Sequence, residues 1–120
     1  MNAPSPDRVR LSPAAALARL PGPSGEPFAN LFRCGTLRLG VYAPRGRDDQ
    51  SPHDQDELYV VLQGSGTFVC GPQREAFAPG DLLFVAAGVP HRFEDFSADL
   101  AVWVIFYGPE GGERPREMDR

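Results

Sequence analysis

The stretch of sequence that decides the fold is residues 57–64, which read Glu57-Leu58-Tyr59-Val60-Val61-Leu62-Gln63-Gly64. Its centre, Leu58–Leu62, is apolar and contains β-branched residues. Residues of this kind between turn signals are typical of a strand. We therefore predict a strand over Leu58–Leu62, which the run Gly64-Ser65-Gly66 interrupts.

The same signal recurs on both sides of this stretch. Before it, apolar residues at 37, 39 and 41 alternate with Arg38 and Gly40, which indicates a half-buried strand. Turn residues separate the other predicted strands, which begin at Phe28 and continue as Thr67–Cys70, Arg74–Ala78, Leu82–Val85, His91–Phe96 and Leu100–Tyr107. About eight short strands without an intervening helix predict an antiparallel sandwich or barrel.

The two ends of the chain lack the strand signal. Residues 1–10 have no period and are expected to fray. Ser12-Pro13 has the form of an N-cap followed by a first-turn proline, which predicts a short helix over Ala14–Leu20. From Gly108 the chain is rich in glycine, proline and charge. We predict one domain, with an N-terminal segment and short helix over 1–27, a barrel over 28–107 and a flexible tail over 108–120.

The composition excludes several classes of function. The chain has 120 residues and a formal net charge of −4, which disfavours a nucleic-acid partner. Every cationic residue is arginine, so lysine Schiff-base chemistry and the Gly-Lys-Ser/Thr phosphate loop are excluded. No apolar run approaches membrane-spanning length, and Met1–Asp7 is polar and proline-rich, unlike a signal peptide. The expected protein is cytoplasmic, without a nucleic-acid or membrane partner.

The chain contains 2 histidines, and both lie in patterned runs. In an extended segment, alternate side chains face the same side. In the first run the side chains of one parity are Ser51, His53, Gln55, Glu57 and Tyr59. In the second run they are His91, Phe93 and Asp95. A narrow barrel would bring these two inward faces within ligand distance of each other.

Two imidazoles and one carboxylate are typical ligands of a divalent transition metal. Iron(II), manganese(II), zinc, nickel and cobalt all accept this set. Three protein ligands leave coordination positions open, which is the feature of a catalytic site. The predicted metal ligands are therefore His53, Glu57 and His91. Aromatic side chains are the candidate pocket walls: Tyr42, Tyr59, Phe68, Phe93, Trp103 and Phe106.

These runs resemble the paired motifs of a small single-domain cupin. Gly46, His53, Glu57 and Gly64 match the first motif of the family. The second motif is matched by Gly80, Gly88 and His91. The resemblance covers about residues 28–107 and implies an all-β double-stranded β-helix, also called a jelly-roll barrel. It further implies a small-molecule ligand or substrate and a homodimer, which would cover sheet edges.

The chain departs from the family pattern at three positions. The first motif histidine is replaced by Ser51, the second motif's proline by Ala86 and its asparagine by Asp95. Serine is a poor neutral ligand, so the resemblance leaves a metal site of three ligands. The carbonyl of Gln55, which has the same parity, could compensate for the lost histidine.

Two classes of function are compatible with these residues. The first is a metal-dependent enzyme acting on a small organic molecule, as a dioxygenase, isomerase or decarboxylase, with Tyr59, Gln55 or Asp95 handling a proton. The second is a non-catalytic protein that binds a small ligand or holds a structural metal. The fold hosts many chemistries, so it does not by itself choose between them.

Overall fold

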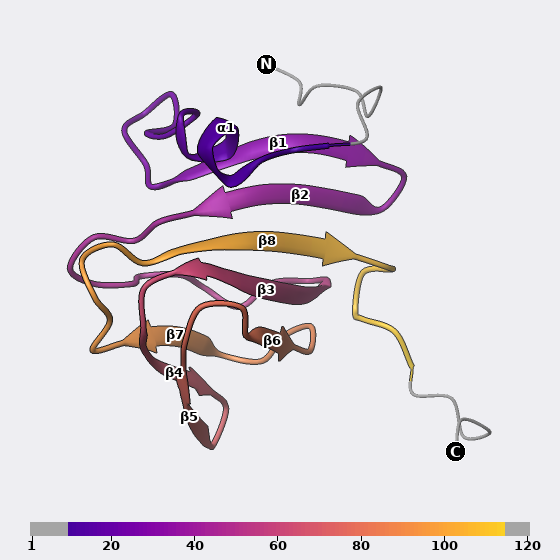
Figure 1. Cartoon of the computed structure of the whole chain (residues 1–120). Coiled ribbons are helices and arrows are strands. Elements are labelled where there is room, and N and C mark those ends of the chain that lie inside the picture. The colour runs from indigo at the N-terminus through magenta and orange to yellow at the C-terminus, as the bar shows by residue number, and fades with distance from the viewer. Residues whose placement is uncertain (1–9, 115–120) are drawn as a thin grey trace.

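A computed structural model describes residues 10–114 as one short helix and two β-sheets (Figure 1). Residues 1–9 and 115–120, where part of the expected fraying and flexible tail was placed, lie outside the described residues. The elements are α1 (Pro13–Leu17), β1 (Phe28–Cys34), β2 (Leu37–Tyr42), β3 (Asp56–Gln63), β4 (Gly66–Cys70), β5 (Gln73–Phe77), β6 (Leu82–Val85), β7 (His91–Glu94) and β8 (Ala101–Tyr107).

The strands form two antiparallel sheets that pack around a shared core. The larger sheet has the order β1-β2-β8-β3-β6 and the smaller one the order β5-β4-β7. Strands adjacent in space but distant in sequence, such as β2 and β8, give the sheets their jelly-roll connectivity. The predicted all-β barrel with a short N-terminal helix is confirmed. Within residues 10–114, no helix has the length and apolar character needed to cross a bilayer.

The predicted strand β3 lies inside the larger sheet, between β8 and β6. Its side chains alternate, and Glu57, Tyr59 and Val61 are buried on the face directed at the smaller sheet. There they meet the core aromatic residues Phe68 and Phe93. The parity expected for β3 is confirmed, and it places one carboxylate among apolar side chains.

The outer face of the larger sheet carries a second apolar cluster. Ser12 caps α1 by accepting a hydrogen bond from the backbone N–H of Ala15 at 3.1 Å, as the sequence predicts. Ala16 of this helix packs against buried residues of β1 and β2. Trp103 belongs to the same cluster. Its predicted role as a pocket wall is therefore wrong. Trp103 faces α1 and its flanking residues, which make the outer face of the sheet apolar, so an apolar side chain on β8 need not face the barrel interior.

The segment after β8 returns to the start of β3. The backbone N–H of Gly111 donates to the carbonyl of Asp54 at 2.7 Å. The backbone N–H of Glu113 donates to the carboxylate of Asp56 at 2.8 Å. These residues belong to the segment for which the composition predicts flexibility, and the hydrogen bonds hold them beside the loop that carries His53.

Candidate metal centre

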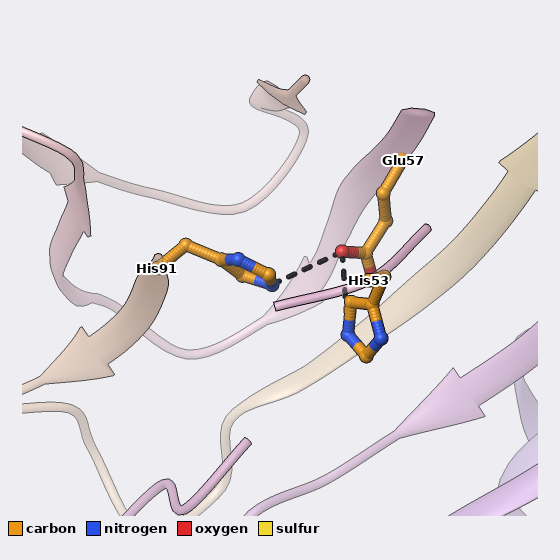
Figure 2. A group of neighbouring side chains, drawn as sticks. All are labelled: His53, Glu57 and His91. Atoms are coloured by element: carbon orange, nitrogen blue, oxygen red, sulfur yellow. Dashed lines mark ion pairs between the residues drawn. The ribbon is translucent and has the colours of Figure 1, made fainter. Parts of the chain in front are cut away.

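His53, Glu57 and His91 meet at one end of the barrel (Figure 2). The Oε1 atom of Glu57 lies 3.1 Å from Nε2 of His91 and 3.8 Å from Nε2 of His53. One ligand atom from each residue can be chosen so that all three lie within 4.8 Å of one another. In Figure 2 dashed lines join one carboxylate oxygen of Glu57 to each of the two imidazole rings, so the three side chains converge.

Three separate parts of the chain supply these side chains. Glu57 is on β3, His53 is on the loop four residues before it, and His91 is the first residue of β7 in the other sheet. The loop that carries His53 is joined to the turn before His91, because the backbone N–H of Gly88 donates to the carbonyl of His53 at 2.7 Å. Gly88 has a φ of 81°, a left-handed conformation that glycine adopts without strain. The turn before His91 therefore helps to set the separation of the two imidazoles.

The surroundings of His91 fix which of its nitrogens faces the cluster. Its side chain is fully buried, and Nδ1 lies 2.9 Å from the carbonyl oxygen of Val89. In the neutral ring Nδ1 therefore carries the proton, and the Nε2 lone pair faces the Oε1 atoms of Glu57 and Gln50, each 3.1 Å away. A lone pair facing two oxygen acceptors requires a cation or a proton between them. Burial lowers the pKa of His91, but the Glu57 and Val89 partners outweigh burial and raise it above the ordinary value.

Glu57 contrasts with the residue beside it. Its side chain is only 2% exposed, yet Oε1 has no hydrogen bond in the described part of the chain. Nε2 of His91 is close enough, at 3.1 Å, but the two groups do not have the geometry of a hydrogen bond. Asp56 is also buried, but its carboxylate accepts the backbone N–H groups of Ala87 and Glu113 at 2.9 and 2.8 Å. Asp56 is therefore satisfied by the fold, whereas Glu57 retains an unused buried acceptor.

His53 is the most accessible member of the cluster, with a side chain that is 31% exposed. Its ring packs edge-on against Phe106, with the centroids 4.9 Å apart. Burial lowers the pKa of His53, and the opposing effect of Glu57 does not fully compensate. A neutral imidazole is the form that binds a metal, so this side chain is suited to ligation.

Gln50 places a further side-chain oxygen at the cluster, and the sequence reasoning missed it. Ser51, which replaces the motif histidine, is exposed, whereas Oε1 of Gln50 reaches His91 and accepts the Tyr59 hydroxyl at 2.7 Å. Asp48 fixes Gln50, since its carboxylate accepts the side-chain amide of Gln50, the backbone N–H of Phe93 and the hydroxyl of Tyr42. The only sequence signal for Gln50 was its position next to the missing histidine.

The three predicted proton carriers lie in different places. Tyr59 is fully buried beside the cluster. The amide of Gln55 donates to the carbonyls of Thr36 and Gly108, and its oxygen accepts two hydrogen bonds from Arg38. Asp95 is exposed, with a φ of 50°, beyond the end of β7. The structure brings only Tyr59 of these three to the cluster.

A cavity of about 310 Å³ opens onto the cluster. It is lined by Phe28, Asn30, Arg38, Tyr42, Gln50, His53, Glu57, Tyr59, Val104 and Phe106. Tyr42, Tyr59 and Phe106 are thus walls, as the sequence predicted, whereas Phe68 and Phe93 pack in the core behind Tyr59. A second, outer cleft of about 600 Å³ shares His53 and Arg38 with this inner cavity. The volume of the inner cavity suits a small molecule.

Comparison with known proteins gives the family of the chain. The family model described as "Cupin domain" matches residues 38–107, which include all three members of the cluster. The chain belongs to the cupin family. This cupin is 36% identical over 85 residues to an uncharacterized protein of Streptomyces coelicolor, a match that spans 69% of the chain and 81% of the relative.

Two further matches of this cupin are more distant. An acireductone dioxygenase of Gluconacetobacter diazotrophicus is 27% identical over 113 residues, which cover 89% of this chain but only 63% of that enzyme. The crystal structure of a cupin-2 domain protein from Shewanella frigidimarina superposes with a TM-score of 0.54 at 17% identity, covering 68% of this chain and 79% of that one. The structural likeness supports the jelly-roll fold.

Proposed function

We propose that this cupin binds a divalent transition metal through His53, Glu57 and His91, and acts on a small organic molecule in the inner cavity. The observation that carries the proposal is the buried Oε1 of Glu57, which lacks a hydrogen bond and lies between two imidazole nitrogens. Isolated buried charge is costly, and a cation at this point would satisfy it. Asp56, on the same strand, is buried with its hydrogen bonds made, so burial of a carboxylate alone does not explain why Oε1 of Glu57 has no hydrogen bond.

The chemistry of the donor set supports a metal with open positions. Two imidazole nitrogens and one carboxylate oxygen suit iron(II), manganese(II), zinc, nickel or cobalt. The carbonyl oxygen of Gln50, 3.1 Å from Nε2 of His91, supplies a fourth donor in place of the histidine absent at Ser51. When bound, such a metal supplies Lewis-acid polarisation of a substrate oxygen.

The residues around the cluster support catalysis by positioning and proton supply. Burial, reinforced by the charge of Glu57, raises the pKa of Tyr59 well above its ordinary value, so the phenol stays protonated. Its hydroxyl is held by Gln50 on the wall of the inner cavity, where it donates a hydrogen bond beside the cluster. The proposed role of Tyr59 is to hold Gln50 at the cluster, and to transfer its single hydrogen-bond donor from Gln50 to a substrate when one binds.

Among the reaction classes that the sequence leaves open, we favour a dioxygenase. The support is the likeness to an acireductone dioxygenase, which extends over most of this chain. The triad of two histidines and one carboxylate is also the ligand type of iron(II) oxygenases. Isomerase and decarboxylase activities use the same open metal positions and are the alternatives for the activity assay.

Elemental analysis of untagged protein, purified without chelator, tests the metal site. We expect about one equivalent of transition metal per chain, and its loss in His53→Ala and His91→Ala. Asp54→Asn, an exposed neighbour of His53, is the control that should keep the metal. Folded protein that holds no metal, and that no added divalent ion stabilises against heat, would overturn the proposal and favour a non-catalytic ligand-binding cupin.

A further inference from the structure

Arg38 places a positive charge on the wall of the inner cavity. It lies on β2, and its guanidinium carbon stacks 4.4 Å from the ring centroid of Phe106. His53 lines the same cavity, and its ring also packs against Phe106. Arg38 lines both the inner cavity and the outer cleft, so its guanidinium is within reach of a molecule bound in either one.

The hydrogen bonds of Arg38 leave its charge without an anionic partner. Its Nε and Nη2 atoms donate to the neutral carbonyl oxygen of Gln55 at 3.0 and 2.8 Å. Among residues 10–114, no carboxylate forms an ion pair with it. Other arginines do have such partners: Arg47 pairs with Asp49, and Arg74 with Glu94. A partly buried guanidinium held by a neutral amide beside a cavity is suited to bind an anion there.

Gln55 fixes the direction of this guanidinium. Its amide group donates to the carbonyls of Thr36 and Gly108, on two different segments, while its oxygen accepts both Arg38 bonds. The stack on Phe106 supports the other side of the Arg38 group. A charged group held in place before a ligand arrives loses little side-chain entropy on binding, and this favours affinity.

The charges of the inner cavity favour an anionic ligand once the proposed metal is bound. Glu57 and Arg38 contribute opposite charges to the lining. A divalent cation at His53, Glu57 and His91 would make the cavity positive overall. Aromatic walls and a volume of about 310 Å³ limit the ligand to a small organic molecule.

We infer that the substrate is a small organic carboxylate. Its carboxylate group is held by the guanidinium of Arg38, and an oxygen elsewhere in the molecule, such as a hydroxyl, is directed at the metal cluster. The inference rests on the proposed function for the role of the metal, but the Arg38 contact does not require it. A planar guanidinium offers parallel N–H donors that match the two oxygens of a carboxylate. Gln55 accordingly acts as a positioning residue for Arg38.

Lactate and lactamide are the probes for this inference. They have nearly the same shape and both carry a hydroxyl group, but only lactate is charged at neutral pH. Their binding is measured by ligand-observed NMR on the chelator-treated full chain, and by calorimetry on the same protein after manganese loading. We expect wild-type protein to prefer lactate by about tenfold to a hundredfold, the range of one charge-assisted hydrogen-bonded pair.

Three variants assign that preference to Arg38. Arg38→Met should reduce the preference to less than about threefold, and Arg38→Lys should restore part of it. Arg33→Met is the control, because Arg33 is exposed in the outer cleft and its loss changes the net charge equally. Since a metal also favours carboxylates, the deciding comparison is between variants at equal metal content. Circular dichroism and thermal melts establish that each variant is folded.

The outcomes separate this inference from the metal proposal. A protein that binds no manganese contradicts the metal proposal, and the metal-free measurement still tests Arg38. An unchanged preference for lactate in folded Arg38→Met, an equal loss in Arg33→Met, or no binding of lactate in either form would overturn the inference. Loss of preference in Arg38→Met alone, in metal-free and loaded protein, would support it.

Discussion

Two adjacent buried carboxylates on β3, Glu57 and Asp56, should differ in how much stability and how much metal binding is lost when their charge is removed. Glu57→Gln removes the proposed metal ligand, whereas Asp56→Asn removes a carboxylate that is already satisfied by two backbone N–H groups. Both changes keep the size and approximate shape of the side chain. The pair therefore compares a functional acid with a structural one at nearly the same depth in the fold, 1% and 4% exposed.

The expected magnitudes follow from the contacts of each group. At 3.1 Å, the attraction between Glu57 and a protonated His91 is about 5 kcal/mol at an effective dielectric constant of about 20. Burial of the carboxylate costs several kcal/mol, so the two effects nearly cancel. At pH 8, His91 beside a neutral glutamine can be uncharged. We expect metal-free Glu57→Gln to differ from wild type by at most about 1 kcal/mol in unfolding free energy.

Asp56→Asn should destabilise the metal-free protein more. The new amide group would face one of the two backbone N–H donors, from Ala87 or Glu113, and leave it without an acceptor. An unsatisfied buried donor costs about 1–3 kcal/mol. Adding metal at about a hundred times its dissociation constant should stabilise wild type and Asp56→Asn by about 2.7 kcal/mol, and Glu57→Gln hardly at all.

Urea unfolding at pH 8, with and without metal, measures all of these free energies. The reasoning is refuted if Glu57→Gln gains as much stability from metal as wild type does. It is also refuted if metal-free Glu57→Gln loses more than about 3 kcal/mol, because Glu57 would then be a structural carboxylate like Asp56.

Three further predictions concern other parts of the molecule. Gln50→Ala should weaken metal binding by about tenfold in a chelator competition assay, whereas Gln55→Ala should leave it unchanged; equal effects would exclude Gln50 as a ligand. The pKa of His91 is raised above its ordinary value of 6.5, so protons should compete with the metal for this side chain at pH values above 6.5. As the pH increases through that range, metal affinity should increase by up to about tenfold per pH unit. The predicted homodimer should use the outer face of edge strand β6, where Leu82 and Phe84 are 62% and 52% exposed. Light scattering should find a dimer that Phe84→Asp converts to monomer, and a monomeric wild type would contradict this.

The strands could be predicted from the sequence because turn residues bound short apolar segments, and the inward face of β3 because side chains alternate along a strand. The Leu82–Val85 strand was predicted with its observed bounds, between turn residues on both sides. The positions of Glu57 and Tyr59 followed from parity on a strand whose pairing with β8 is regular from Asp56 to Val61. Where backbone pairing continues, side-chain direction is determined by the pleat.

The same parity reasoning does not extend beyond the ends of strands. Asp95 was expected on the face of His91, but β7 ends at Glu94 and the backbone then turns with a positive φ. Gln55 precedes β3, and its contacts are with Arg38 and two backbone carbonyls. The loop from 43 to 55 has no strand period, so the direction of Gln50 depends on the carboxylate of Asp48, a contact that no local pattern contains.

The contact between Gln50 and Tyr59 links the departure from the family motif to the chemistry of the site. A carbonyl oxygen has two lone pairs, and the Tyr59 hydroxyl occupies one of them at 2.7 Å. The other is available on the side of His91. An amide oxygen is a harder donor than the imidazole it replaces, so this donor set should favour iron(II) or manganese(II) over a softer metal such as copper. Gln50 would thus both hold the Tyr59 hydroxyl and shift the metal preference, whereas a histidine ligand would supply a softer nitrogen donor.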